Sequence, residues 1–198
     1  MRVALLLSGG MDSVALAYWK RPEFAYTIDY GQLAAEGEIR AAAAVCEALG
    51  IHHRILFADC REVGAGDMAG RPPSSLAPVS EWWPFRNQLL ITLAGAAAIS
   101  DGINDLLLGA VSTDSVHADG RPEFFERIAE LMALQEGEIR VSAPAIAMTS
   151  VKLVSVSGVP ISVLAWSHSC HVGSLACGQC RGCVKHANTM KCLGHGDY

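Results

Sequence analysis

The chain has 198 residues, of which 51% are hydrophobic and 18% are charged, and its formal net charge is −5. This composition is typical of a globular protein and excludes a disordered chain. The acidic balance and the absence of lysine or arginine runs argue against a dedicated nucleic-acid-binding protein. No stretch reaches 18 uninterrupted apolar residues, and the apolar start lacks a cleavage region, so we expect neither a membrane span nor a signal peptide.

Short apolar runs alternate with helical stretches along the chain. Strands are expected over residues 1–7, 24–28, 51–57, 106–110 and 140–143. Helices are expected over residues 14–19, 36–49, 87–98, 122–136 and 149–156. Residues 59–84 are rich in Gly, Pro and Ser and are expected to form an excursion over the site. The alternation predicts a Rossmann-like α/β fold, a doubly wound and mostly parallel sheet that binds ligands at the carboxyl ends of its strands.

We expect one domain over residues 1–198, with no linker or internal repeat. A four-cysteine segment, residues 167–198, is expected to form part of that domain rather than a separate unit.

The first apolar run leads directly into Ser8-Gly9-Gly10-Met11-Asp12-Ser13. A glycine turn between a strand and a helix presents backbone N–H groups to an anion, and the helix dipole favours negative charge there. The two serine hydroxyls add donors, and Asp12 is expected to cap the helix or to position a metal ion. An ordinary tight turn with a polar cap is the alternative, and we interpret the complete pattern as a phosphate-binding loop.

Four cysteines follow the pattern C-x6-C-x2-C-x2-C, namely Cys170, Cys177, Cys180 and Cys183. Two short C-x2-C steps can direct their sulfurs to one tetrahedral zinc ion, and a site closed by four cysteines is structural. Two disulfides, buried free thiols and an iron–sulfur cluster are the alternatives. Three further cysteines, Cys46, Cys60 and Cys192, make the total odd, which fits the reducing cytoplasm.

Polar residues stand where the expected strands end. Tyr30 is a candidate for stacking on a base, with a partly buried aromatic as the alternative. Arg86 can bind a carboxylate or phosphate bidentately. Asp114 and Asp119 are candidates for holding magnesium or the amino groups of a substrate, against the alternative of solvated loop acids. Trp83, like Trp82 before it, is expected to pack rather than to shield the site.

The histidines are scattered, and most are expected to be ordinary surface or core residues. His168 and His171 flank Cys170, and they are candidates for supporting the bound metal from outside its ligand shell.

These motifs together resemble the 7-cyano-7-deazaguanine synthase family, within the PP-loop superfamily of N-type ATP pyrophosphatases. The loop at residues 8–13 and the four cysteines are the specific matches. Weaker matches follow in the expected order along nearly the whole chain: Asp29-Tyr30-Gly31-Gln32, Pro84-Phe85-Arg86-Asn87, Gly109, Thr113-Asp114, Asp119, Pro144 and Lys152.

The resemblance implies an ATP-dependent carbon–nitrogen ligase. In that family 7-carboxy-7-deazaguanine is adenylated on its carboxylate, ammonia gives the amide, and a second adenylation yields the nitrile. The implied cofactors are one structural Zn²⁺ and ATP with Mg²⁺, and a homodimer is compatible with the resemblance. The implied catalytic residues are Asp12, Ser13, Arg86 and Asp114. The implied ATP- and substrate-binding residues are Ser8, Gly9, Gly10, Asp12, Ser13, Tyr30, Gln32, Asn87, Gly109 and Asp119.

The chain departs from the family pattern directly after Gln32. The family has an Arg-His pair there, whereas this chain has Leu33 and Ala34, and the following acids Glu36 and Glu38 are shifted by one residue. Two other functions therefore stay open. One is a related ligase that stops at the amide or transfers the activated deazaguanine to another amine, such as a protein terminus. The other is an inactive, zinc-stabilised binding module.

Overall fold

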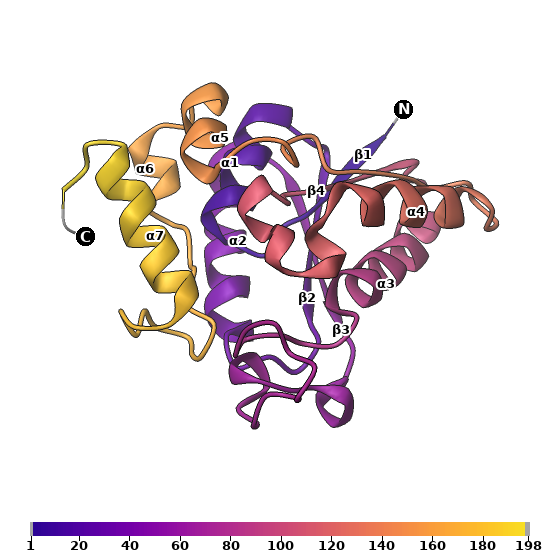
Figure 1. Ribbon diagram of the computed structural model, residues 1–198. Helices are drawn as coiled ribbons and strands as arrows, with labels where there is room; N and C mark the ends of the chain where they lie inside the picture. Colours follow the sequence, from indigo (N-terminus) through magenta and orange to yellow (C-terminus); the bar gives the residue numbers. More distant parts are fainter. Residues whose placement is uncertain (1, 197–198) are drawn as a thin grey trace.

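The chain forms a single five-stranded sheet covered by helices on both faces, in a computed structural model that describes residues 2–196 (Figure 1). The strand order is β3-β2-β1-β4-β5, and all four pairings are parallel. The strands are β1 (Val3–Leu6), β2 (Phe24–Asp29), β3 (His52–Phe57), β4 (Asp105–Leu108) and β5 (Arg140–Ser142). This confirms the doubly wound parallel fold. Residue 1 of the first expected strand and residues 197–198 of the cysteine segment lie outside the described residues.

Helices α3 and α4 cover one face of the sheet, and the other helices lie on the opposite side (Figure 1). The helices are α1 (Met11–Lys20), α2 (Ala35–Leu49), α3 (Arg86–Asp101), α4 (Pro122–Ala133), α5 (Ser150–Ser157), α6 (Ile161–Leu164) and α7 (Arg181–Cys192). None of the helices within residues 2–196 combines the length and the apolar character needed to cross a membrane.

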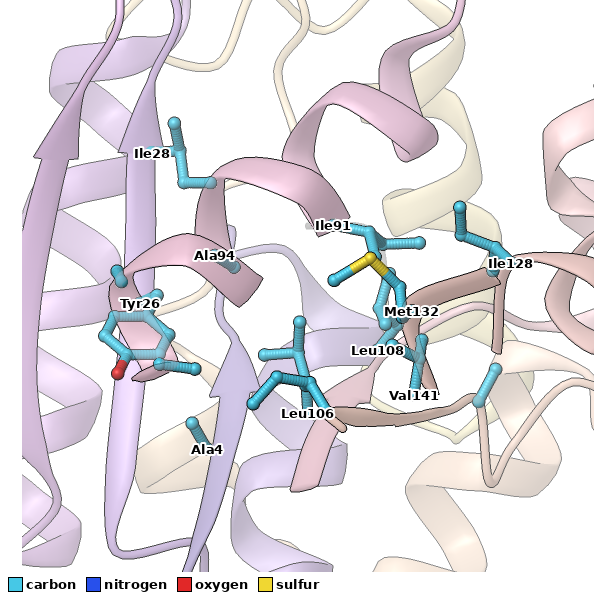
Figure 2. Packing of buried hydrophobic residues seen from close by; sticks show 14 of the residues in the cluster. Ala4, Tyr26, Ile28, Ile91, Ala94, Leu106, Leu108, Ile128, Met132 and Val141 are labelled. Atoms are coloured by element: carbon cyan, nitrogen blue, oxygen red, sulfur yellow. The ribbon is translucent and has the colours of Figure 1, made fainter. Parts of the chain in front are cut away.

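The sheet separates two apolar cores. In β1, Ala4 packs into the core beneath α3 and α4, whereas the next residue, Leu5, packs into the core beneath α1 and α5. Successive side chains of a strand point to opposite faces, so a strand buried on both faces reads as an uninterrupted apolar run. Figure 2 shows the first core, to which β4 contributes Leu106 and Leu108 and α4 contributes Ile128 and Met132.

Helix α1 begins three residues earlier than the sequence predicts. Gly10 is its extended N-terminal cap residue (φ −70°, ψ 156°), and Met11 is the buried first helical residue. The last half of the phosphate-binding loop is therefore the first turn of the helix. Asp12 lies within that turn, so the expectation that it caps the helix was wrong.

Helices α6 and α7 were not predicted. Helix α7 contains few apolar residues, and it buries mainly Cys183, Thr189 and Met190. Its packing therefore depends on a small number of contacts and on the cysteine cluster at its first turn.

The expected excursion between β3 and α3 is present, and it is packed rather than loose. It contains two 3-10 turns, Arg61–Val63 and Asp67–Ala69. Met68 and Trp83 are each only 2% exposed and join the core beneath α3. The prediction that Trp83 packs is thus confirmed, and the excursion covers the carboxyl end of β2.

Candidate functional site

A cavity of about 380 Å³ opens at the carboxyl ends of β1, β2 and β4. This volume lies in the usual range for small-molecule sites. Its walls come from the loop at residues 8–13, the turn after β4, the excursion, and the segment from residue 168 to α7. The cavity therefore joins motifs that lie at opposite ends of the sequence.

The phosphate-binding loop is held in one conformation by glycine and by its own hydroxyl groups. Gly9 has φ +74°, and a Cβ atom there would lie 2.7 Å from the backbone oxygen of Glu38, so only glycine fits. The Ser13 hydroxyl donates to the Gly10 carbonyl at 2.9 Å and lies 3.3 Å from the Ser8 hydroxyl. The N-terminus of α1 consequently faces the cavity with its N–H groups, an arrangement suited to an anion.

Gly109 permits the turn after β4 to approach this loop. A Cβ atom on Gly109 would lie 2.9 Å from the Cα atom and 3.0 Å from the backbone nitrogen of Ser13. The glycine matched from the sequence therefore allows close contact between two backbone segments of the site.

Two of the expected acids meet a lysine that the sequence analysis did not identify. Lys185 of α7 donates to Asp12 Oδ2 at 2.9 Å and to Asp114 Oδ1 at 3.0 Å. The other oxygen of Asp114 accepts a hydrogen bond from the Val111 backbone at 3.1 Å. Burial raises the pKa of Asp12, and the charge of Lys185 opposes that shift. No local signal marks Lys185, because its partners lie 173 and 71 residues away.

Away from Lys185 and the phosphate-binding loop, the cavity wall is mostly aromatic and apolar. The rings of Tyr30 and Trp83 meet edge to face, with centroids 4.8 Å apart. Tyr30 lines the cavity but is only 3% exposed, so most of its ring packs in the core. Trp83 also lines the cavity, and its buried indole Nε1 has no hydrogen-bond partner among residues 2–196.

Gln32 supports the site without lining the cavity. Its carbonyl accepts from the Tyr30 backbone at 2.9 Å, and its amide donates to the Ile28 carbonyl at 3.0 Å and to Glu38 Oε2 at 2.7 Å. Glu38 does line the cavity. Burial raises the pKa of Glu38 to about 7, although the Gln32 amide and the charge of Arg86 oppose that shift. In the sequence, Glu38 is marked only as an acid shifted by one residue from the family pattern.

Arg86 and Asn87 begin helix α3, and Asp119, from the 3-10 turn Ala118–Gly120, contacts this helix start. The Asn87 backbone N–H donates to Asp119 Oδ2 at 3.0 Å, and the Asn87 side chain donates to the Asp119 carbonyl at 2.7 Å. Asp119 thus caps α3. The Arg86 guanidinium lines the cavity, contacts Met68 Sδ at 3.2 Å, and forms no salt bridge with any residue that the structure describes.

The four cysteines form one compact cluster. Their Sγ atoms all lie within 4.8 Å of one another, with Cys177 and Cys183 separated by 3.9 Å. Four sulfurs arranged tetrahedrally around one zinc ion would be about 3.8 Å apart. The cysteines are free thiols, so the alternative of two disulfides is not formed. The cluster is therefore suited to binding a metal ion.

Hydrogen bonds join the cysteine segment to the phosphate-binding loop and to the excursion. The His168 backbone N–H donates to the Gly9 carbonyl at 2.8 Å. Arg181 donates to the buried Glu81 carboxylate at 2.8 Å, and His117 Nε2 lies 3.7 Å from the same oxygen. Although burial alone would raise it, these contacts lower the pKa of Glu81 to about 2. The rings of the two candidate supporting histidines, His168 and His171, line the cavity.

Lys152, which matched a lysine of the family, is exposed and is not part of the cavity wall. Ser150, two residues earlier, does line it, and its buried hydroxyl has no hydrogen-bond partner among the described residues.

Most of the site residues expected from the sequence line this one cavity. They are Ser8, Gly10, Asp12, Ser13, Tyr30, Arg86, Asn87, Gly109, Asp114 and Asp119. Gly9 and Gln32 lie just behind it.

Comparison with known proteins identifies relatives over nearly the whole chain. The family model described as queuosine biosynthesis protein QueC matches residues 2–194. The 7-cyano-7-deazaguanine synthase of Koribacter versatilis is 33% identical, with 98% of this chain and 90% of the relative covered. That of Methanosarcina mazei is 28% identical, with 98% and 95% covered.

A solved structure shares the fold. It is the U34-tRNA thiolase NcsA from Methanococcus maripaludis with its [4Fe-4S] cluster, with a TM-score of 0.55 and 17% identity. The similarity covers all of this chain and 67% of the thiolase. Since the family model spans the cavity, the phosphate-binding loop and the cysteine cluster, this chain belongs to the queuosine biosynthesis protein QueC family and is an enzyme of the 7-cyano-7-deazaguanine synthase type.

Proposed function

We propose that the protein is an ATP-dependent ligase that converts 7-carboxy-7-deazaguanine and ammonia to 7-cyano-7-deazaguanine. The observation that carries the proposal is that one cavity combines a phosphate-binding loop with the unpaired guanidinium of Arg86. The first suits the phosphates of ATP, and the second suits a carboxylate. The names of the relatives supply the identity of the product.

The proposed reaction proceeds through two adenylations. A substrate carboxylate oxygen attacks the α-phosphorus of ATP, and pyrophosphate leaves with the electron pair of the broken P–O bond. Ammonia then displaces AMP and loses a proton to give the amide. The amide oxygen attacks the α-phosphorus of a second ATP and pyrophosphate leaves, and loss of AMP and of both nitrogen-bound protons from the adenylated amide gives the nitrile. The phosphate-binding loop would stabilise the charge on each departing pyrophosphate.

Magnesium would be held by carboxylate oxygens of Asp12 and Asp114, and it would supply charge neutralisation on the phosphates. Oxygen donors are the ligands this ion prefers, and the buried Asp12 Oδ1 atom has no partner within residues 2–196. Asp119 is a poorer candidate than the sequence suggested, since its carboxylate already caps α3.

We propose zinc rather than an iron–sulfur cluster for the four cysteines. The related thiolase is described with a [4Fe-4S] cluster, in which each cysteine binds a different iron atom. That arrangement spreads the sulfurs more widely than a single ion does. A separation of 3.9 Å between Cys177 and Cys183 supports a single tetrahedral ion.

The aromatic end of the cavity would hold the deazaguanine ring. Tyr30 and Trp83 would contact the flat ring, and Arg86 would bind its carboxylate. The sequence suggested Asp114 and Asp119 for the hydrogen-bonding edge, and both line the cavity, but Asp114 already bonds to Lys185 and Asp119 to the Asn87 backbone. We therefore propose that Glu38 accepts hydrogen bonds from the ring N–H and the exocyclic amino group.

The test is an assay of pyrophosphate release with 7-carboxy-7-deazaguanine and ammonia, combined with mass spectrometry of the products. Substrate-dependent pyrophosphate release with formation of the nitrile is expected. Accumulation of the amide alone, or of a protein adduct, would instead support the related ligase that the substitutions at Leu33 and Ala34 leave open. No pyrophosphate release at all would favour the inactive binding module. Calorimetric titration with the carboxylate compound, its amide and guanine tests recognition, and tightest binding by guanine would contradict the role of Arg86.

A further inference from the structure

Lys185 occupies a position that neither the motifs nor the comparisons assign. Its ammonium group lies between two carboxylates of the cavity, 2.9 Å from Asp12 and 3.0 Å from Asp114. Asp12 belongs to the first turn of α1 within the phosphate-binding loop, and Lys185 itself lines the cavity. The lysine is therefore held at the phosphate end of the site.

Two unpartnered oxygens beside this lysine indicate that a ligand completes the arrangement. Asp12 Oδ1 and the Ser150 hydroxyl are buried without a well-formed hydrogen bond among residues 2–196, although Ser150 interacts with the Asp12 carboxylate, and both residues line the cavity. Burying polar atoms without partners is costly, so such atoms in a native protein point to water, an ion or a ligand. Ser150 is only 4% exposed and stands at the first residue of α5, where N–H groups also favour an anion.

The charges of the site favour Lys185 here in addition to the proposed magnesium ion. Asp12 and Asp114 together carry two formal negative charges, which would repel the polyphosphate chain of ATP. Lys185 reduces that total to one, and its compact ammonium group can bind phosphate oxygens as a point charge. Lys152, the lysine expected from the family pattern, cannot serve this purpose from its exposed place outside the cavity.

We propose that Lys185 binds the pyrophosphate part of ATP, so that the metal-binding segment contributes a residue of the nucleotide site as well as stability. This inference rests on the proposed ligase function. As the bond between the α-phosphorus and its bridging oxygen breaks, the electron pair passes to that oxygen, and the ammonium group of Lys185 stabilises the charge. No proton transfer is required, and the stabilisation by the Lys185 ammonium group is greatest in the transition state.

The cysteine cluster sets the position of this lysine. Cys183 lies two residues before Lys185 in α7, and the Thr189 hydroxyl donates to the Lys185 carbonyl at 2.8 Å within the same helix. A metal ion bound by the four cysteines would fix the first turn of α7 against the segment that contains Cys170. In the same segment, the His168 backbone N–H donates to the Gly9 carbonyl. The metal and the phosphate group are thereby linked through one helix.

The experiment compares Lys185→Ala, Lys185→Gln and Lys185→Arg with the matched control Lys152→Ala in the full-length, metal-loaded protein. We expect Lys185→Ala and Lys185→Gln to lower kcat for pyrophosphate release by about 100-fold or more. Both variants should also raise the inhibition constant of pyrophosphate. Lys185→Arg should keep most of the phosphate affinity, and Lys152→Ala should behave like the wild type.

Metal content and Tm separate a phosphate-binding role from a structural one. Lys185→Gln retains hydrogen-bond donors for both aspartates, so it should keep the bound metal and a Tm close to that of the wild type. Unchanged kcat and unchanged pyrophosphate inhibition in Lys185→Gln would overturn the proposal, as would a loss of activity in Lys152→Ala alone. If the wild type released no pyrophosphate, the ligase assignment would fail. Calorimetry with ATP would then decide the role of Lys185 separately, and equal affinities of wild type and Lys185→Gln would overturn it.

Discussion

Asp12 and Glu38 are both partly buried carboxyl groups at the cavity, and they differ in their partners. Asp12 bonds to the ammonium group of Lys185, whereas Glu38 accepts a hydrogen bond from the neutral amide of Gln32. Burial raises the pKa of both groups, and this shift is opposed by Lys185 at Asp12 and by the Gln32 amide and the charge of Arg86 at Glu38. The two residues are therefore suited to different tasks, one at the phosphates and one at a titrating edge of the substrate.

Replacing Asp12 tests the phosphate end. We expect Asp12→Asn to lower pyrophosphate release by about 100-fold or more, because the amide removes a negative charge that orients Lys185 and can hold magnesium. Circular dichroism and metal analysis should match the wild type, since the substitution preserves side-chain shape. Wild-type turnover in this variant would show that the loop does not hold ATP.

Replacing Glu38 tests the heterocycle end and has a distinct pH signature. The folded-state pKa of about 7 lies above the ordinary value of 4.5, so the stabilisation from Glu38 is complete below pH 4.5 and is lost as the pH rises through 7. We expect Glu38→Gln to have a higher Tm than the wild type at pH 8 and a smaller advantage at pH 6.

The same variant should bind the deazaguanine carboxylate more weakly at pH 8. For the wild type, affinity should fall by up to about tenfold from pH 8 to pH 6 as Glu38 becomes protonated, and Glu38→Gln should lack that dependence. The control is Glu36→Gln, which alters an exposed carboxylate on the same helix, 3.4 Å from Arg40. Equal pH profiles for the wild type and Glu38→Gln would refute the assignment of the substrate edge to Glu38.

At the scale of elements, the site depends on how closely β4 approaches the start of α1. We expect Gly109→Ala to destabilise the protein by about 1–3 kcal/mol, since the new methyl group would overlap the Ser13 backbone at 2.9–3.0 Å. Activity should fall further than the loss of folded protein explains, because the phosphate-binding loop itself is displaced. Denaturant titration alongside the pyrophosphate assay measures both effects.

The control for that variant is Gly173→Ala, because no atom lies within 4 Å of the added methyl group. Its unfolding free energy should stay within about 0.5 kcal/mol of the wild type. Equal effects of the two substitutions would show that the close approach at Gly109 is unimportant.

Helix α7 offers a second test at this scale. We expect Cys180→Ser to lose the metal and to lower Tm, because a metal site that does not exist in the unfolded chain makes its binding energy part of the folding energy. Cys192→Ser is the matched control, since Cys192 is an exposed thiol at the other end of the same helix and outside the cluster. Elemental analysis should find zinc in the wild type, and iron in its place would contradict the proposed ion.

At the scale of the whole molecule, the sequence predicts what local patterns encode. The central strands β1, β2 and β4 are largely apolar because both faces of the sheet are covered, whereas the edge strands β3 and β5 carry more polar residues, and all five were found to within a few residues. The sequence did not predict α7, whose burial relies on Cys183, Thr189 and Met190 rather than on an apolar stripe. Lys185 and Glu38 were missed as site residues because their positions follow from contacts between distant segments.

The departure from the family pattern after Gln32 also becomes clear only in three dimensions. Ala34 is fully buried at the start of α2, and the half-exposed Leu33 side chain lies against Gly70 of the excursion. A larger His-type side chain at position 34 has no space without rearrangement of the core. Leu33 and Ala34 are thus part of the packing between the start of α2 and the excursion.

The distance along the chain between Asp12 and Lys185 has a consequence for protein synthesis. A ribosome adding about 5–20 residues per second needs on the order of 10–30 seconds to translate the 173 residues that separate them. During that interval all five strands are completed, so the sheet can form before α7 is made. A nascent chain therefore has its phosphate-binding loop long before its lysine, and premature termination yields a product that cannot complete the nucleotide site.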